Sequence, residues 1–206
     1  METAIYGKGM KPAGITPAVA LINPNFPHNV GAAVRAASCF DVRQVWYTGN
    51  RVSMEPPKSA DSSKKGSGRL PREERMKGFR DVELRQFDYF LDQFPHATPV
   101  AVEVRKNSEN LITFEHPENP LYIFGPEDGN IPSSILALCH RFVMIPVSHC
   151  TNLAAAINLV LYDRRSKLVR DGKEPLTTAW DVLNEVEHRG WWDSNPEEAG
   201  LVRSRP

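Results

Sequence analysis

Three short segments of this 206-residue sequence combine residue types that could bind a small polar ligand. Residues 23–35, 124–132 and 146–152 each follow an apolar run and change at once to Gly, Pro, Asn or charged residues. Turns of this kind expose backbone N–H and C=O groups, which are good partners for a nucleotide-like ligand. None of the three is a G-x-G-x-x-G sequence or a P-loop. The sequence therefore disfavours classical dinucleotide binding and ATP hydrolysis through a Walker motif.

Alternating strands and helices are expected to position these segments. A strand at 18–22, a helix at 30–40 capped by Asn29 and a strand at 44–48 make a strand–helix–strand unit, which is typical of a parallel sheet. Ligands bind at the carboxyl ends of the strands of such a sheet. The predicted fold class is α/β, with a mostly parallel sheet and helices on both faces. Further strands are predicted at 99–104, 121–124 and 141–147, and further helices at 87–94, at 133–139, from Thr151 onward, and after Thr178 as N-cap with Asp181 three residues on.

Length and composition favour a single domain over 1–206, with a core at about 18–169 and a C-terminal helix and tail at 170–206. No apolar run approaches the roughly 18 residues of a membrane-spanning helix, and the start of the chain lacks a secretory apolar stretch. The three cysteines form no C-x-x-C pair, so the sequence predicts neither a metal site nor a disulfide framework. A reduced, cytoplasmic compartment is expected.

Charge is unevenly distributed, although the formal net charge is zero. Residues 51–80 contain nine basic and four acidic residues, whereas residues 174–206 contain seven acidic and three basic ones. The stretch 51–78 has no apolar periodicity and is rich in Pro, Ser, Gly and Lys, which indicates a long loop inserted into the domain.

Taken together, the three segments resemble the motifs of the SpoU-type (TrmH-like) RNA methyltransferases, the trefoil-knotted branch of the SPOUT superfamily. Residues 29–35 (NVGAAVR) are similar to that family's N-x-G-x-x-x-R. Residues 124–132 (FGPEDGNIP) are similar to its F-G-x-E…G-[IL] stretch. Residues 145–154 (IPVSHCTNLA) resemble its I-P-M…S-L-N-[LV]-S. The resemblance covers roughly residues 18–169.

The resemblance implies methyl transfer from S-adenosylmethionine to a ribose 2′-hydroxyl of tRNA or rRNA, by a homodimer with a C-terminal trefoil knot. Four residues are then the expected catalytic set. Arg35 would grip the neighbouring phosphate or stabilise the developing alkoxide. Asn29 and Asn152 would fix Arg35 and the ribose, and Glu127 would orient Arg35 or Asn29, a structural role ahead of a general-base role.

The same resemblance assigns the cofactor and RNA contacts. Gly125 would permit a close approach to the adenosine, and Ile145 and Thr151 would offer main-chain groups to it. The expected cofactor-binding residues are Val102, Gly125, Ile145, Cys150, Thr151 and Leu153. The expected RNA-binding residues are Arg35, Lys64, Lys65, Arg69 and Arg72.

One departure leaves alternatives open. Cys150 stands where the family usually has Ser, and a thiol is a weaker hydrogen-bonding group than a hydroxyl. A catalytically silent RNA-binding or assembly protein with the same fold is therefore the alternative function. Methylation of a base nitrogen is a third, which the N-x-G-x-x-x-R segment argues against. The basic loop is either a solvated disordered segment or an RNA-binding one.

Overall fold

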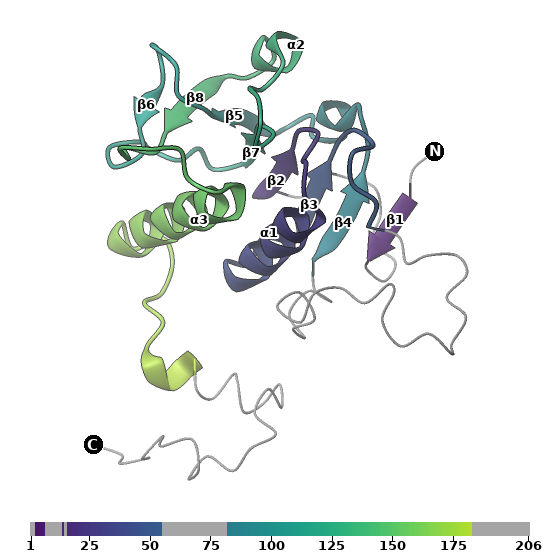
Figure 1. Ribbon diagram of the computed structural model, residues 1–206. Coiled ribbons are helices and arrows are strands. Elements are labelled where there is room, and N and C mark those ends of the chain that lie inside the picture. Colours follow the sequence, from purple (N-terminus) through teal and green to yellow (C-terminus); the bar gives the residue numbers. More distant parts are fainter. Residues whose placement is uncertain (1–2, 7–13, 15, 55–81, 183–206) are drawn as a thin grey trace, which may run out of the picture. The chain divides into compact units, whose positions relative to one another are not determined.

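The computed structural model describes residues 3–6, 14, 16–54 and 82–182. The chain forms two compact units, Met1–Ser166 and Lys167–Pro206. The first unit contains one sheet, whose order is β1-β4-β3-β2-β7-β5-β8-β6 (Figure 1). The strands are β1 (Thr3–Tyr6), β2 (Ala18–Leu21), β3 (Gln44–Tyr47), β4 (Glu83–Gln86), β5 (Thr98–Val102), β6 (Glu109–Asn110), β7 (Pro120–Phe124) and β8 (Arg141–Met144).

The sheet is parallel throughout, except that the edge strand β1 pairs with β4 in the antiparallel sense. The central strands are buried on both faces, which suits the continuous apolar runs of β2 and β7. Alternate residues enter two separate cores. Val19 and Leu21 point into one core, and Ala18 and Ala20 point into the other.

Helices cover both faces, as predicted. The long helices α1 (Pro27–Cys39) and α3 (Leu153–Arg170) pack on one face of the sheet (Figure 1). The short helix α2 (Ser133–Leu136) and the 3-10 helix η3 (Phe90–Gln93) contribute to the core of the other face. The α/β fold class is confirmed. The trefoil knot and the domain boundaries stay predictions.

Helices α1 and α3 lie side by side on their face of the sheet (Figure 1). The ring of Phe40, just after α1, meets that of Tyr162 edge to face at 6.5 Å, and Arg165 lies 3.9 Å from the Asp41 carboxylate. The buried side of α1 consists mainly of Ala, Gly and Val, which lets the helix backbone approach the sheet closely.

Near the middle of the chain one prediction is wrong and one strand was missed. Residues 87–94 form no amphipathic helix, only the single 3-10 turn of η3. Strand β4 was not predicted, because its sequence ELRQ looks like that of an exposed loop. In the structure Glu83 and Arg85 are both buried and form an ion pair, and Glu83 also accepts a 3.0 Å hydrogen bond from Gln44. Their mutual charge compensation is what allows this polar strand inside the sheet.

The start of α1 also differs from its prediction. The helix begins at Pro27, with Phe26 as N-cap, so Asn29 lies inside the first turn and does not cap it. At the other end of the described chain, in the second unit, the predicted cap is confirmed. The Thr178 hydroxyl accepts a hydrogen bond from the Asp181 backbone N–H, while the Asp181 carboxylate accepts one from the Thr178 N–H.

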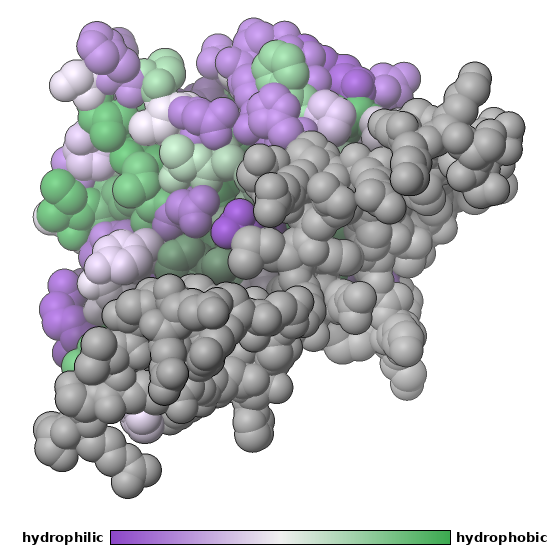
Figure 2. All heavy atoms as spheres, turned by 60° about the horizontal axis from the view of Figure 1, so that its bottom comes forward, coloured by the Kyte–Doolittle hydropathy of each residue, from purple (hydrophilic) through white to green (hydrophobic). Residues whose placement is uncertain are grey.

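The described surface carries several large apolar side chains, among them Ile112, Val147 and Leu159. Figure 2 shows apolar groups gathered on one side of the described part of the molecule. No helix within the described ranges is both long and apolar enough to span a bilayer. The predicted RNA-binding residues Lys64, Lys65, Arg69 and Arg72 lie outside the described residues.

The packing of α3 against the sheet predicts a large difference between two isoleucines. Ile157 is fully buried, so Ile157→Ala removes packed methyl groups and should lower the free energy of unfolding by about 2–5 kcal/mol. Ile112 is 68% exposed, and Ile112→Ala should change the free energy by about 0.5 kcal/mol or less. Urea unfolding of both variants measures this, and equal losses would show that α3 does not anchor the core.

Candidate functional site

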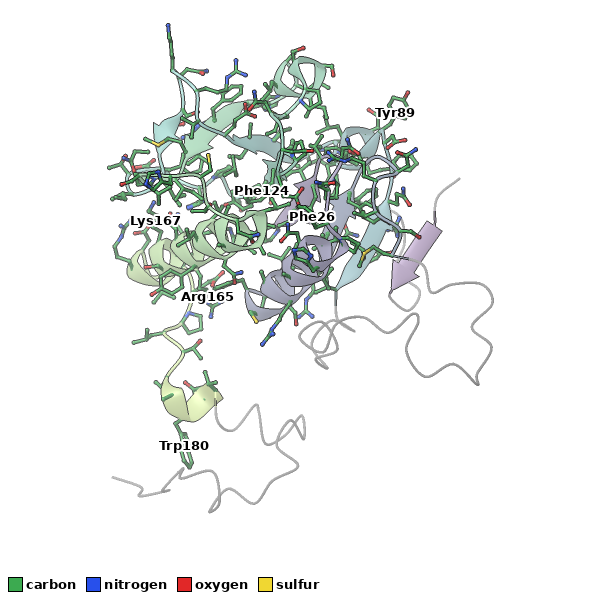
Figure 3. The ribbon with its side chains drawn as sticks, in the orientation of Figure 1. Phe26, Tyr89, Phe124, Arg165, Lys167 and Trp180 are labelled. Carbon is green, nitrogen blue, oxygen red and sulfur yellow. The ribbon has the colours of Figure 1, made fainter. Side chains whose placement is uncertain are left out.

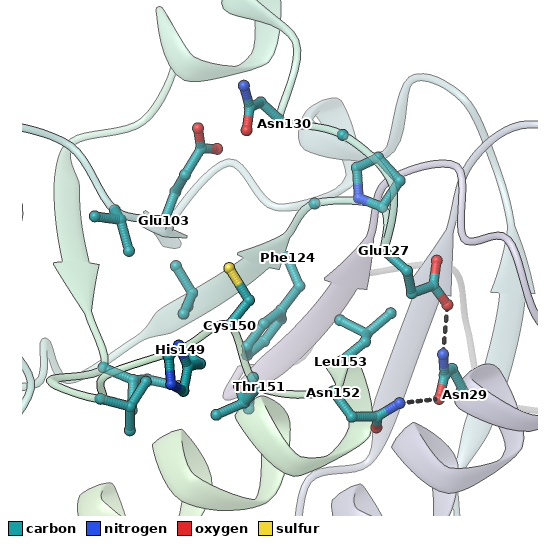
Figure 4. A pocket seen from close by; sticks show the side chains of 18 of the residues that line it. Asn29, Glu103, Phe124, Glu127, Asn130, His149, Cys150, Thr151, Asn152 and Leu153 are labelled. Carbon is teal, nitrogen blue, oxygen red and sulfur yellow. Dashed lines mark hydrogen bonds between the residues drawn. The ribbon is translucent and has the colours of Figure 1, made fainter.

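The segments that follow four neighbouring strands enclose a cavity at one edge of the sheet (Figure 4). These strands, β2, β7, β5 and β8, run parallel, so their carboxyl ends meet at that edge. The cavity has a volume of about 970 Å³. Its described lining includes the acids Glu103 and Glu127 and contains no Lys or Arg.

A chain of side-chain hydrogen bonds links the three segments at the cavity wall (Figure 4). The Asn152 Nδ2 group donates to Asn29 Oδ1 at 3.1 Å, and Asn29 Nδ2 donates to Glu127 Oε1 at 2.5 Å. The second oxygen of Glu127 accepts a 2.7 Å hydrogen bond from the backbone N–H of Asn25. Each Asn29 amide atom therefore has a partner, which fixes the orientation of that amide.

The local structure around each amide explains its position. Pro27 occupies the first turn of α1, where its missing N–H costs no hydrogen bond. Asn29 follows in the same turn and is 2% exposed. Asn152 precedes α3, and its Oδ1 accepts the Ala154 N–H at 2.9 Å, so it caps that helix while its Nδ2 reaches Asn29.

Two opposing effects act on the pKa of Glu127. Burial raises it, but hydrogen bonds from the Asn29 amide and from the backbone N–H groups of Asn25, Glu127 and Phe26 lower it by more. The net pKa lies below the usual value of 4.5. Glu127 is consequently a carboxylate at neutral pH, with its oxygens already engaged, which suits an orienting role and makes it a poor proton acceptor.

The turn after β7 is tightly folded. A Cβ atom added to Gly125 would lie 3.2 Å from the backbone nitrogen of Ile131, so a side chain there would crowd the returning loop. The Ile131 N–H donates a 3.0 Å hydrogen bond to Glu103, the residue that follows β5. Glu103 thus anchors the far end of the same loop that carries Glu127.

An ion pair holds the middle of this loop from outside. Arg51 binds both carboxylate oxygens of Asp128, at 2.8 and 2.5 Å, and its guanidinium lowers the pKa of that carboxyl. Arg51 follows β3, where Gly49 has a positive φ of 78° and a Cβ atom would lie 2.2 Å from Asn23 Oδ1. The start of the basic stretch 51–80 is therefore attached to the loop that carries Glu127.

A model of the SpoU rRNA methylase family matches residues 17–162. The chain belongs to this family. No curated protein sequence matches the chain.

Solved structures share the fold of this SpoU chain. An AdoMet-bound rRNA methyltransferase from Sinorhizobium meliloti superposes with a TM-score of 0.58 at 19% identity, over 73% of this chain and 56% of that one. The A. aeolicus TrmH/SpoU tRNA modifying enzyme has a TM-score of 0.60 at 17% identity, with coverages of 84% and 87%. A structure described under the 2-OH methylation of C/U34 on tRNA has a TM-score of 0.58 at 22% identity, with coverages of 78% and 99%. The chain thus spans little more than half the length of the first of these proteins.

The structure brings most of the predicted site residues of this SpoU chain together. All six predicted cofactor residues line the cavity, as do three of the four predicted catalytic residues. Arg35 does not: it is exposed on α1, six residues beyond Asn29, and is absent from the cavity lining. Cys150 is exposed, and in Figure 4 its sulfur points into the open centre of the site. The predicted residues that line the cavity are, from the catalytic set, Asn29, Glu127 and Asn152, and from the cofactor set, Val102, Gly125, Ile145, Cys150, Thr151 and Leu153.

Sequence reasoning missed several lining residues. Glu103 lies at the carboxyl end of the strand predicted at 99–104 and directly follows β5 in the structure, so the rule that ligands bind at strand carboxyl ends could have found it. Phe26 lies in a Pro-rich turn whose path the sequence does not reveal. Among the described residues, no group of three or more His, Cys, Asp or Glu is arranged to hold a metal ion. Met144 lies outside the three predicted segments, whereas other lining residues lie within them but were not in the predicted site set, among them His28, Asn130, Ser148 and His149.

The hydrogen bonds of Glu127 predict an acid-dependent loss of stability. Because its folded-state pKa is lowered, the ionised carboxylate stabilises the fold above about pH 4.5, and this contribution is lost as the pH falls through the folded-state pKa. Glu127→Gln should lower the free energy of unfolding at pH 7 and flatten its decrease toward pH 3. Urea unfolding at both pH values measures this, with Glu118→Gln as the exposed control. A Glu127→Gln profile parallel to that of the wild type would refute the proposed engagement of the carboxylate.

Proposed function

We propose that this chain is an S-adenosylmethionine-dependent RNA methyltransferase, and that it transfers the methyl group to a ribose 2′-hydroxyl of tRNA or rRNA. The observation that carries the proposal is the cavity at the strand ends, with its hydrogen-bonded series Asn152–Asn29–Glu127. Membership of the SpoU family supports RNA methylation. One structural neighbour described under 2-OH methylation of tRNA supports the choice of the ribose hydroxyl.

The lining of the cavity fits S-adenosylmethionine. Val102, Phe124 and Leu153 offer apolar surface for an adenine ring, and the space beside Gly125, which a Cβ atom would fill, allows a close backbone approach. When bound, the cofactor supplies a methyl group on a cationic sulfonium. The carboxylates of Glu103 and Glu127, in a described lining without Lys or Arg, favour such a cation. A volume of about 970 Å³ is at the upper end of the range for small-molecule sites, which leaves room for a nucleotide beside the cofactor.

The side chains of the wall orient the substrate. Asn29 is immobilised between Glu127 and Asn152, so the amide–carboxylate series forms a rigid polar wall against which a ribose can be placed. Arg35, exposed on the same helix as Asn29, is proposed to hold a phosphate next to the target ribose or to stabilise the developing alkoxide. The basic residues Lys64, Lys65, Arg69 and Arg72 are proposed to bind RNA phosphates without sequence preference.

We also propose that the protein is a homodimer, as the family resemblance implies. The exposed apolar side chains on one side of the first unit, seen in Figure 2, offer a surface that a second copy could cover.

The deciding experiment combines cofactor binding with product analysis. Titration calorimetry should show one S-adenosylmethionine site per chain. Mass spectrometry of tRNA and rRNA nucleosides, from cells with and without the gene, should show one 2′-O-methylated nucleoside that depends on the gene. RNA binding without cofactor binding would favour the silent RNA-binding protein, and loss of a base-methylated nucleoside would refute ribose specificity.

The proposed role of Arg35 predicts a selective loss of catalysis. Arg35→Ala should lower the rate of methyl transfer by about 100-fold or more, because a charge-stabilising donor is removed, and should leave cofactor affinity unchanged. Arg35→Lys should rescue little, since an ammonium cannot reproduce the planar fork of the guanidinium. Arg43→Ala is the matched control, because Arg43 is also exposed but lies before β3, at the amino-end edge of the sheet. Single-turnover kinetics measure the rate, and near-normal turnover of Arg35→Ala would refute the assignment.

A further inference from the structure

Phe26 is an aromatic residue in an unusual place. It is the N-cap of α1, with extended backbone angles and no side-chain hydrogen bond to the helix. Short polar residues are strongly preferred at this position, because they accept a hydrogen bond from the first turn. Phe26 makes no such bond, and 45% of it is exposed to solvent. Neither helix capping nor burial in the core explains a phenylalanine here.

The ring of Phe26 lies against that of His28. The two ring centroids are 5.3 Å apart and the planes differ by 25°, which is a stacked arrangement. The other ring pairs formed by the described residues cross at 69° to 89°. His28 is exposed as well, so two nearly parallel rings stand together at the surface. This pair is called the Phe26–His28 platform below.

The platform lies at the cavity. Both residues line it, and Asn29, the central member of the hydrogen-bonded wall, is the next residue in the chain. Figure 3 shows Phe26 close to the start of α1, and Phe124, at the end of β7, lines the same cavity. A flat ligand group stacked on the platform would therefore be placed beside the polar wall.

We propose that the platform stacks an unpaired base of the RNA and so positions the target nucleotide; this rests on the proposed function. Single-stranded RNA is commonly recognised by stacking of splayed-out bases on aromatic side chains. The described lining of the cavity has no Lys or Arg to hold a phosphate there, so stacking is the interaction that this rim offers to a nucleotide. Stacking tolerates any base, and the RNA sequence is then selected elsewhere.

The test compares Phe26→Ala, Phe26→Trp and a control, Tyr89→Ala. Tyr89 is 78% exposed and does not line the cavity. The probe is a single-stranded oligoribonucleotide carrying 2-aminopurine, free or annealed to its complement, added to protein saturated with S-adenosylmethionine. Stacking predicts that 2-aminopurine fluorescence changes when the wild type is added to the single strand and stays constant with the duplex.

Phe26→Ala should weaken binding of the single strand by roughly 5- to 150-fold, the range expected for one stacked base. Phe26→Trp should bind within about twofold of the wild type, since it keeps an aromatic face, and so should Tyr89→Ala. The methyl acceptors for kinetics are tRNA and rRNA isolated from cells that lack the gene. With these, Phe26→Ala should raise KM for RNA more than it lowers kcat. Circular dichroism and calorimetry with S-adenosylmethionine check that the fold and the cofactor site are unchanged.

Several results would overturn the platform. One is a Phe26→Ala variant whose RNA affinity and KM for RNA equal those of the wild type. Another is a Tyr89→Ala variant that loses as much RNA affinity as Phe26→Ala does. A loss of S-adenosylmethionine affinity in Phe26→Ala would show that the ring contacts the cofactor. A change in the sedimentation coefficient of Phe26→Ala would show that the ring contacts a second copy of the chain. Failure of the proposed function looks different: the wild type itself would then bind no S-adenosylmethionine, whether or not Phe26 contributes to RNA binding.

Discussion

The site depends on one carboxylate that joins segments far apart in the sequence. Glu127 accepts hydrogen bonds from the side chain of Asn29 and the backbone of Asn25, about 100 residues earlier, while Asn29 in turn binds Asn152. A buried amide can satisfy its donor and its acceptor only if both neighbours are in place. The three turns therefore constrain one another, and each would leave a buried polar group unpaired if it moved. The wall of the cavity is rigid for this reason.

The sheet makes this arrangement possible. Strands β2 and β7 are neighbours in register, with Leu21 opposite Phe124, so the turns that follow them start side by side. The small residues on the inner side of α1 let the helix lie close to the sheet, which brings Asn29 down to the level of the strand ends. Two further contacts hold the loop after β7 from either side, Arg51 through Asp128 and Glu103 through the Ile131 N–H. Loop positions that carry function are thus fixed by the scaffold rather than by their own sequence.

Much of this was accessible from the sequence, for physical reasons that differ between elements. The apolar runs of β2 and β7 predict buried parallel strands, and the rule on strand carboxyl ends then brings Asn29, Glu127 and Asn152 to one edge. Strand β4 escaped prediction because its stability depends on a tertiary ion pair between Glu83 and Arg85, which a local pattern does not reveal. The N-cap of α1 was misassigned because Asn29 is a preferred capping residue, but its amide is used by Glu127 and Asn152 instead. Residues that break a local preference in this way are expected at functional or strained sites.

The charge of the cavity lining differs from that of the basic stretch 51–80, so the two suit different parts of a ligand. The cavity lining includes the carboxylates of Glu103 and Glu127 and no described Lys or Arg, an environment that favours a cationic ligand and disfavours phosphate. For the RNA substrate proposed above, this means that the polyanionic backbone would be held outside the cavity and a nucleoside would enter it. Arg51 is the first basic residue of the stretch 51–80, yet its charge is neutralised by Asp128. Its contribution is therefore to attach the start of that stretch to the loop that carries Glu127.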